Sequence, residues 1–311
     1  MSKFYTSASP HLRSPQSTRR IMLDVIIALV PACAASVVFF GWRALMLLGV
    51  CVLTCVFSEY ISRIVMKREQ TIGDLSAVVT GILLALNLPA GLNPLMAVFG
   101  SVAAIVVVKQ MFGGIGMNFV NPALAARIIL TVSFPTAMTT WVPTFKETVV
   151  DGVSYATPLA QPVGTYSYVD LLIGNHGGSM GETCAVAIIL GGIYLVLRKV
   201  IAPTIPVIYI GTCGVLALLM GHNPVVQVLS GGIMLGAVFM ATDYTTSPVT
   251  KWGKVIYALG CGVLTMLIRH YSNLPEGVSF SILLMNILTP LIENMTAPRV
   301  FGGKRERKGA K

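Results

Sequence analysis

The chain has 311 residues, of which 55% are hydrophobic and only 11% are charged, and its mean hydropathy is +0.78. These values exclude an ordinary soluble protein and indicate that a lipid bilayer is the solvent. The net charge of +10 does not indicate nucleic-acid binding, because the basic residues gather beside apolar segments. No long polar block separates those segments, so we expect a single integral membrane domain over residues 1–311.

The chain begins with a polar, basic stretch over residues 1–20, which indicates a tail rather than a cleaved signal. Ten apolar segments of helical character follow, and a second basic tail covers residues 296–311. The sequence therefore predicts an all-α polytopic membrane protein with about ten transmembrane helices. The predicted spans are residues 21–42, 44–66, 76–89, 93–110, 121–140, 180–197, 203–221, 224–241, 254–270 and 277–295.

The distribution of Lys and Arg predicts the orientation of these spans. Most of the 22 basic residues fall on the side that contains both tails. The opposite side has only Arg43, Lys146 and Arg269, while Arg127 lies inside the fifth span. By the positive-inside rule, both tails are cytoplasmic and the number of spans is even.

Two of the shorter spans resemble each other. Gly81 opens "GILLALNLPAGLNP" in the third span, and Gly232 opens "GIMLGAVFMATDYTTSP" in the eighth. Because the two are five spans apart, they run in opposite directions, which is typical of two inverted five-helix repeats with a site near the membrane midplane. Chance similarity between two segments rich in Gly, Leu and Met is the alternative.

A polar connection joins the fifth and sixth spans on the outer side. Its centre is "VDGVSYATPLAQP", residues 150–162, and we assign residues 141–179 to the extracytoplasmic loop. Prolines and glycines explain its composition as a hydrated, turn-rich connection. They do not explain its length, since long loops in compact proteins are usually functional.

Several ionisable or amide side chains lie at or near membrane depth, where each is costly and tends to face the protein interior. Asp24 is the firmest functional candidate, with a structural ion pair beside Arg19 and Arg20 as the equal alternative. The others lie mostly near span ends, where water removes much of the cost. The full set is Asp24, Glu59, Asp74, Arg127, Glu182, Asp243, Glu276, Asn286 and Glu293.

The six cysteines nearly all lie in apolar segments, which predicts buried thiols rather than disulfides. Cys51 and Cys55 share a helix face, but no second pair or histidine accompanies them, so we expect no metal site there.

A denser motif is "GGIGMNFVNPALAARIIL", residues 113–130, between the fourth and fifth spans. Its glycines allow close backbone approach, and Pro122 suits the first turn of a helix capped by Asn121. That structural interpretation assigns no role to Asn118. Side-chain amides can donate and accept hydrogen bonds at the edge of a flat heterocycle and carry no charge, so Asn118 and Asn121 are candidate ligand contacts.

These residues resemble a known family, the D subunits of the ion-pumping Rnf ferredoxin:NAD oxidoreductases. The resemblance is less close to the homologous B subunits of the sodium-pumping NADH:quinone oxidoreductases, which carry a longer N-terminal extension. The likeness runs nearly end to end, from "SPHLRSPQSTRRIMLDVIIALVPA" through the two motifs above and "LLIGNHGGSMGETCAVAIILGGIYLVLRK". It continues in "MATDYTTSPVTKWGKVIYALGCGVLTMLIR" and "PEGVSFSILLMNILTPLIENMTAPRVFG".

The resemblance implies a urea-transporter-like fold and two flavins. In the family, the last threonine of a Ser/Thr-x-Ala-Thr motif is linked through a phosphodiester to flavin mononucleotide (FMN). Here the motif is Ser154, Tyr155, Ala156 and Thr157, with Tyr155 bulkier than the usual second residue. The second flavin is a non-covalent riboflavin, for which Asn118 and Asn121 are the implied contacts. We expect no catalytic acid–base pair, nucleophile or metal of the chain's own.

The resemblance also implies a cellular location, a role within a complex and a set of partners. The chain would sit in the bacterial cytoplasmic membrane, relay electrons between flavins, and act only within a complex that couples ferredoxin and NAD to Na⁺ or H⁺ transport. Implied partners are the A, B, C, E and G components of the Rnf complex, especially G and the membrane components A and E, and a flavin transferase that works outside the cytoplasm. Two alternatives are a channel or secondary transporter with the same inverted repeat, and a purely structural scaffold.

Overall fold

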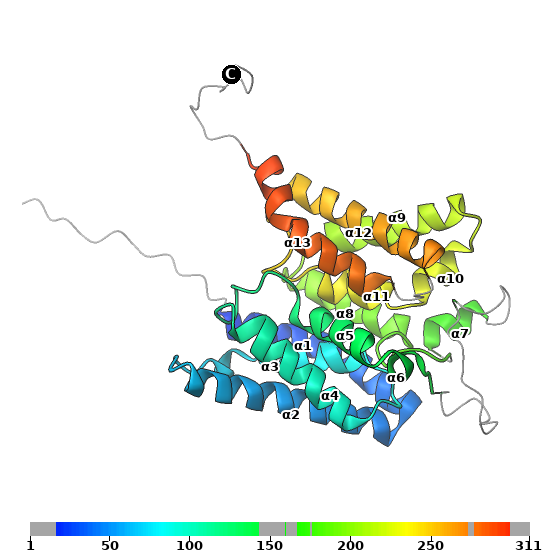
Figure 1. Cartoon of the computed structure of the whole chain (residues 1–311). Helices are drawn as coiled ribbons and strands as arrows, with labels where there is room; N and C mark the ends of the chain where they lie inside the picture. Colours follow the sequence, from blue (N-terminus) through cyan, green and yellow to red (C-terminus); the bar gives the residue numbers. More distant parts are fainter. Residues whose placement is uncertain (1–16, 143–158, 160–166, 175, 273–276, 299–311) are drawn as a thin grey trace, which may run out of the picture.

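The computed structural model describes residues 17–142, 159, 167–174, 176–272 and 277–298. The described residues form a bundle of helices (Figure 1). In chain order the helices are α1 (Thr18–Phe40), α2 (Trp42–Val65), η1 (Ile72–Asp74), α3 (Ser76–Leu86), α4 (Pro94–Val102), η2 (Ala103–Gln110), α5 (Pro122–Ser133), α6 (Pro135–Thr139), α7 (Tyr168–Ile173), α8 (Ala185–Leu197), α9 (Thr204–Leu219), α10 (Pro224–Leu229), α11 (Ile233–Leu235), η3 (Gly236–Met240), α12 (Lys251–Tyr271) and α13 (Val278–Thr296).

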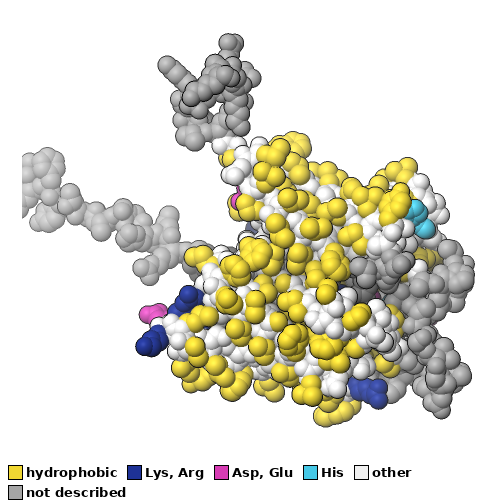
Figure 2. Space-filling view, in the orientation of Figure 1, with side chains coloured by type: hydrophobic (Ala, Val, Ile, Leu, Met, Phe, Trp, Pro, Cys, Tyr) yellow, Lys and Arg dark blue, Asp and Glu magenta, His cyan; other side chains and the backbone are white. Residues whose placement is uncertain are grey.

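Helices occupy all ten predicted spans, but they differ in length. Among the described residues, α1, α2, α12 and α13 are long and apolar enough to cross a membrane unaided. Five more apolar helical segments are shorter, namely α3, α4 with η2, α5, α8 and α9. Hydrophobic side chains cover the face of the bundle in Figure 2, and Lys and Arg lie toward its two ends. The chain is therefore an all-α membrane protein, as the composition predicts.

Asparagine followed by proline starts three of the helices. Asn93, Asn121 and Asn223 each accept a hydrogen bond of 3.0 Å at the side-chain oxygen from the backbone N–H two residues on. Proline at the next position needs no such partner, because it has no N–H, and its fixed φ suits the first turn. The predicted cap at Asn121 is confirmed.

The first interrupted span is completed from a distant part of the chain. Helix α3 ends at Leu86, and the extended chain after it pairs with the segment before α8 through an antiparallel bridge between Pro89 and Ser179. Met180 N–H donates to Leu88 O at 3.1 Å, and Gly181 N–H donates to Leu86 O at 2.6 Å. Carbonyls that the broken helix leaves free are thereby satisfied inside the protein, as lipid requires.

Two glycines allow helices to approach at backbone distance. A Cβ at Gly81 would lie 2.7 Å from Val52 Cα, so α3 packs on α2 with no room for a side chain. A Cβ at Gly191 on α8 would meet the carbonyl oxygen of Ala28 on α1. Gly81 lies within α3 rather than opening it, whereas Gly232 is the N-cap residue of α11. The first of the two similar segments, which opens at Gly81, therefore begins more than one turn after the start of α3.

Figure 1 shows α1 to α4 on one side of the bundle and α9, α12 and α13 on the other, with α5, α8 and α11 between them. Contacts of α1 with α8, and of α5 with α13, join the two groups. The described N-terminal start of α1 and the end of α13 both lie toward the left of the view, whereas α6, α7 and α10 lie toward the right.

Asp24 makes an ion pair, but with a partner the sequence did not predict. Its carboxylate lies 3.3 Å from Arg198 Nη2, just beyond the end of α8, and accepts a hydrogen bond of 3.1 Å from the Tyr194 hydroxyl. The alternative interpretation of Asp24 as a member of a structural ion pair is therefore confirmed, but the expected partners, Arg19 and Arg20, are wrong, because the partner is Arg198. The packing of α8 on α1 brings the guanidinium of Arg198 alongside Asp24.

Candidate functional site

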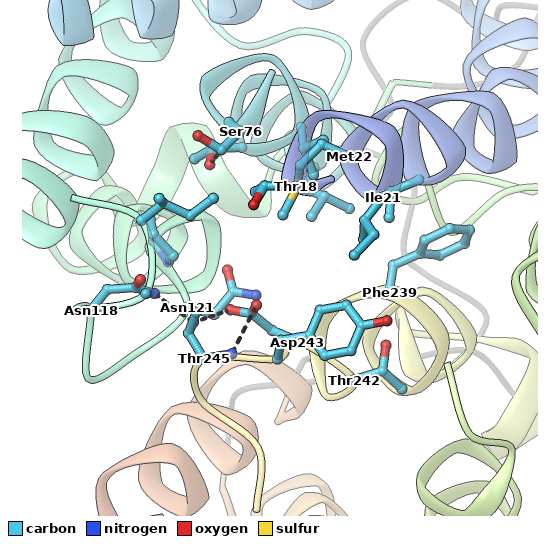
Figure 3. A pocket seen from close by; sticks show the side chains of 18 of the residues that line it. Thr18, Ile21, Met22, Ser76, Asn118, Asn121, Phe239, Thr242, Asp243 and Thr245 are labelled. Carbon is cyan, nitrogen blue, oxygen red and sulfur yellow. Dashed lines mark hydrogen bonds between the residues drawn. The ribbon is translucent and has the colours of Figure 1, made fainter. Parts of the chain in front are cut away.

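A pocket of about 400 Å³ opens where several helix ends meet. Its size falls within the range of small-molecule and cofactor sites. Figure 3 shows Thr18, Met22 and Ser76 on one side of it, with Thr242, Asp243 and Thr245 across from them. Apolar side chains make up much of the wall, and the polar lining residues are Thr18, Ser76, Thr80, Lys109, Asn118, Asn121, Thr242, Asp243, Tyr244 and Thr245.

Both predicted ligand-contact amides line this pocket. Asn121 accepts from the N–H of Ala123 at 3.0 Å, and its Nδ2 donates to Met240 O at 3.4 Å. It therefore joins the start of α5 to the end of η3. Asn118 Nδ2 donates to Val120 O at 3.0 Å and to Thr245 Oγ1 at 3.1 Å. Both side chains are fixed by the protein, which orients their remaining polar groups before any ligand arrives.

Asp243 supplies a negative group on the same wall. Its carboxylate accepts from Thr245 Oγ1 at 3.0 Å, and more distantly from Thr245 N–H and Thr246 Oγ1, both at 3.4 Å. Thr245 thus links Asn118 to Asp243. Burial raises the pKa of the Asp243 carboxyl, and the hydrogen bonds from the two threonines counteract that shift.

A buried ion pair stands behind the wall that includes Ser76. Lys109 Nζ lies 3.1 Å from both carboxylate oxygens of Glu59 and donates to Ser76 Oγ at 2.6 Å. Gln110 and Thr71 also donate to Glu59, at 2.8 and 3.1 Å. The sequence indicates only a cytoplasmic charge at a span end for Lys109, because nothing local shows that Glu59, fifty residues earlier, would face it.

Unusual helix geometry places residues at this pocket. Lys109 lies in η2 and Phe239 in η3, and both of these segments are π-helical. An inserted residue rotates the following side chains relative to an ordinary α-helix, and such turns are frequent at functional sites. One π-helical segment therefore places a residue at the pocket from the first half of the chain and the other from the second half.

A second buried polar cluster lies at the interrupted span and does not line the pocket. Arg127 Nη1 donates to Asn87 Oδ1 at 2.6 Å, and Arg127 Nη2 lies 3.8 Å from Glu182 Oε1. Glu182 Oε2 also accepts from Ser179 N–H at 3.4 Å. The arginine on α5 thus ties the end of α3 to the extended segment before α8, so the intramembrane charge has a structural partner.

The remaining predicted polar residues also have packing roles. Asn286 and Tyr257 share a hydrogen bond of 2.6 Å between α13 and α12, and Glu293 accepts from Val249 N–H at 2.9 Å. Asp74 accepts from Ser76 N–H at 2.8 Å at the start of α3. Cys51 and Cys55 are both buried. Glu276 lies outside the described residues.

The predicted attachment motif, with Ser154, Ala156 and Thr157, lies outside the described residues. Leu159, two positions later, is described, and its Cδ1 would lie 2.5 Å from a Cβ at Gly231, beside the turn between α10 and α11. Helix α7, which follows the predicted loop's centre, contacts α10 as well. The described residue nearest the motif therefore sits at the end of the bundle that carries α7 and α10.

Apolar helices, an interrupted span and a pocket between helix ends define the class of the molecule as a polytopic α-helical membrane protein. The model of one protein family, described as NQR2, RnfD, RnfE family, matches residues 5–302. The chain therefore belongs to this family.

Curated relatives match over nearly their whole length. The chain is 48% identical to the D subunit of the Na⁺-translocating ferredoxin:NAD⁺ oxidoreductase complex of Acetobacterium woodii, covering 98% of this chain and 97% of the relative. It is 41% identical to the D subunit of the proton-translocating ferredoxin:NAD⁺ oxidoreductase complex of Clostridium ljungdahlii, covering 97% of each. The D subunit of an ion-translocating oxidoreductase complex of Halorhodospira halophila is 36% identical over 97% of this chain and 96% of its own.

Proposed function

We propose that this chain is the D subunit of an ion-translocating ferredoxin:NAD⁺ oxidoreductase complex. The observation that carries the proposal is end-to-end similarity, at 48% and 41% identity, to two relatives that bear that name. The chain would be one component of a redox-driven ion translocase and would not catalyse the whole reaction alone. Its partners would be the A, B, C, E and G components of the complex, with G, A and E in direct contact.

The coupling ion is either Na⁺ or H⁺. The two relatives named above translocate different ions by name, although each aligns with almost the whole of this chain. Overall similarity in this component therefore does not select the ion. Ion uptake by proteoliposomes containing the complete complex, measured with and without sodium, would make the choice.

The interior pocket is the proposed riboflavin site. It has a volume of about 400 Å³, much of its wall is apolar, and Asn118 and Asn121 offer fixed amide groups at its edge. This combination suits a flat heterocycle with hydrogen-bonding edges, so the residues present fit the group. A bound flavin would supply one- and two-electron redox chemistry. The chain's part would be to orient the ring with the amides, to exclude water with the apolar wall, and to set the local charge.

Thr157 is the proposed attachment site of a covalent FMN, with Ser154 and Ala156 as motif residues and a flavin transferase as the maturation partner. The support is the Ser-x-Ala-Thr pattern within a chain that belongs to the family. A phosphodiester link to the threonine leaves the flavin ring unmodified, so its potential would depend on the protein surroundings.

The chain is proposed to sit in the bacterial cytoplasmic membrane as ten spans in two inverted halves. Support comes from the helices in all ten ranges and from the two groups of helices joined through α1 and α8. Both tails would be cytoplasmic and the flavin-bearing loop extracytoplasmic. The start of α1 and the end of α13 lie at one end of the bundle, while α6 and α7, which flank residues 143–166, lie at the other (Figure 1).

Flavin fluorescence in a denaturing gel tests the covalent cofactor. When the chain is produced with a flavin transferase, we expect a fluorescent band for the wild type and for Thr165→Ala, a control in the same loop. Thr157→Ala should abolish the band. A wild-type chain without fluorescence would refute the covalent flavin and favour a transporter or scaffold, and a band that survives Thr157→Ala would place the attachment elsewhere.

A further inference from the structure

The ion pair between Lys109 and Glu59 is almost completely buried. Lys109 is 3% exposed and Glu59 is fully buried. Buried ion pairs contribute little net stability, because the cost of removing both charges from water offsets their attraction. A pair of this kind therefore invites a functional explanation, and its position beside the pocket supplies one.

The pair is polarised with respect to the pocket. Lys109 lines the pocket, as does Ser76, which accepts its third hydrogen bond, whereas Glu59 is not among the lining residues. The positive end of the pair thus faces the cavity and the negative end lies behind it, held by Gln110 and Thr71. Across the pocket stands Asp243, a group of opposite charge (Figure 3). The cavity therefore experiences a field that favours negative charge on the Ser76 side.

We propose that Lys109 is the residue that stabilises the reduced form of the redox cofactor in this pocket, by compensating the negative charge that reduction adds. This inference rests on the proposed function, since it takes the pocket ligand to be a flavin. Each electron added to the ring adds one negative charge unless a proton follows. The effect of Lys109 is electrostatic, and no group is transferred to or from it. Glu59 acts through Lys109 and sets how much of that positive charge the pocket experiences.

The expected effect is measurable. Two unit charges about 8 Å apart, at an effective dielectric constant of about 20, change a charge-dependent equilibrium by more than tenfold, which sets the general scale for a charge that lines the pocket. Removing the Lys109 charge should therefore lower the ratio of reduced to oxidised flavin, at fixed applied potential, by roughly tenfold. Removing the Glu59 charge should raise that ratio, because the cation is then less compensated.

The test is a redox titration of the flavin bound to the purified full-length chain. A Thr157→Ala background removes the covalent FMN, so the absorbance of the non-covalent flavin alone is followed. The variants are Lys109→Met, Lys109→Arg and Glu59→Gln. Lys67→Met is the matched control, since Lys67 is exposed and does not line the pocket. Flavin content per chain is measured in parallel after denaturation.

We expect Lys109→Met and Glu59→Gln to shift the midpoint in opposite directions, with Lys109→Arg and Lys67→Met close to the parent. A purely structural ion pair would instead lower flavin content in both variants without opposite shifts. If Lys109→Met does not fold, the double variant Lys109→Met with Glu59→Gln leaves no unpaired charge and should reverse the Glu59→Gln shift. Bound flavin with unchanged or parallel shifts overturns the inference alone, whereas a parent chain without flavin overturns the proposed pocket ligand as well.

Discussion

The contact between α1 and α8 makes a quantitative prediction about Gly191. A methyl group there would meet the carbonyl oxygen of Ala28, which is backbone and cannot rotate away, and would lie 2.9 Å from the ring of Phe239. Overpacking of this kind costs about 1–3 kcal/mol. Alanine also favours a helix over glycine by about 1 kcal/mol, which partly hides that cost. A single variant would therefore understate the clash.

Gly211 provides the matched control. It also lies within a helix, α9, but a Cβ there would have nothing within 4 Å. Gly191→Ala and Gly211→Ala share the helix-propensity gain, so the difference between them isolates the packing cost of about 1–3 kcal/mol. Each kcal/mol corresponds to ~2–4 °C in Tm for a chain of this order of size.

The assay is thermal unfolding of the full-length protein in detergent, followed by the loss of the monodisperse peak in size-exclusion chromatography. Gly211→Ala should unfold at or slightly above the wild-type temperature, and Gly191→Ala several degrees below Gly211→Ala. Equal unfolding temperatures for the two variants would show that α1 and α8 do not pack at backbone distance, and the arrangement of the two helix groups described above would be wrong.

Three further predictions concern the pocket and its surroundings. Asn121→Ala should lose the α5 cap, which costs about 0.5–2 kcal/mol, and should also lose the pocket flavin, whereas the control Asn93→Ala should lose only the equivalent cap on α4. Unfolding temperature and flavin content, measured on the same samples, separate the two effects. Equal flavin content in the two variants would count against a role of Asn121 in the pocket. Arg198→Met should lower Tm slightly through the loss of its pairing with Asp24, and the difference from wild type should shrink at high salt; a salt-independent difference would indicate lost packing instead. Burial raises the pKa of the Asp243 carboxyl above its ordinary 3.8, so ionisation of this group opposes folding and stability should fall as pH rises through the raised pKa. Asp243→Asn should therefore flatten the dependence of Tm on pH. An unchanged pH profile in this variant would mean that other groups cause the dependence.

The sequence predicts the helices well because apolar runs and Asn-Pro starts are local signals. The start of α5 at Asn121 and Pro122 needs only neighbouring residues, and the structure has the predicted cap. The partner of Asp24 is a different matter. Arg198 lies 174 residues away, and only the packing of α8 on α1 brings them together, so the local sequence offered only Arg19 and Arg20 as partners for an ion pair.

In the candidate site, too, local sequence signals identify some residues and miss others. Asn118 and Asn121 stand out as amides in a glycine-rich segment, and both line the pocket. Lys109 does not stand out, because a lysine at the end of an apolar span is the ordinary mark of the cytoplasmic side. Its burial depends on Glu59, Ser76 and a π-helical turn, none of which is visible in the residues beside it.

The backbone bridge beside Pro89 has a consequence for biosynthesis. Helix α3 leaves the ribosome about ninety residues before Met180 and Gly181, the donors that satisfy the carbonyls of Leu88 and Leu86. During that interval the nascent first half has to hold those carbonyls in water, in the translocation machinery or in a temporary pairing. A fragment that stops before residue 142 should therefore insert poorly by itself, and co-expression with the remaining fragment should rescue it.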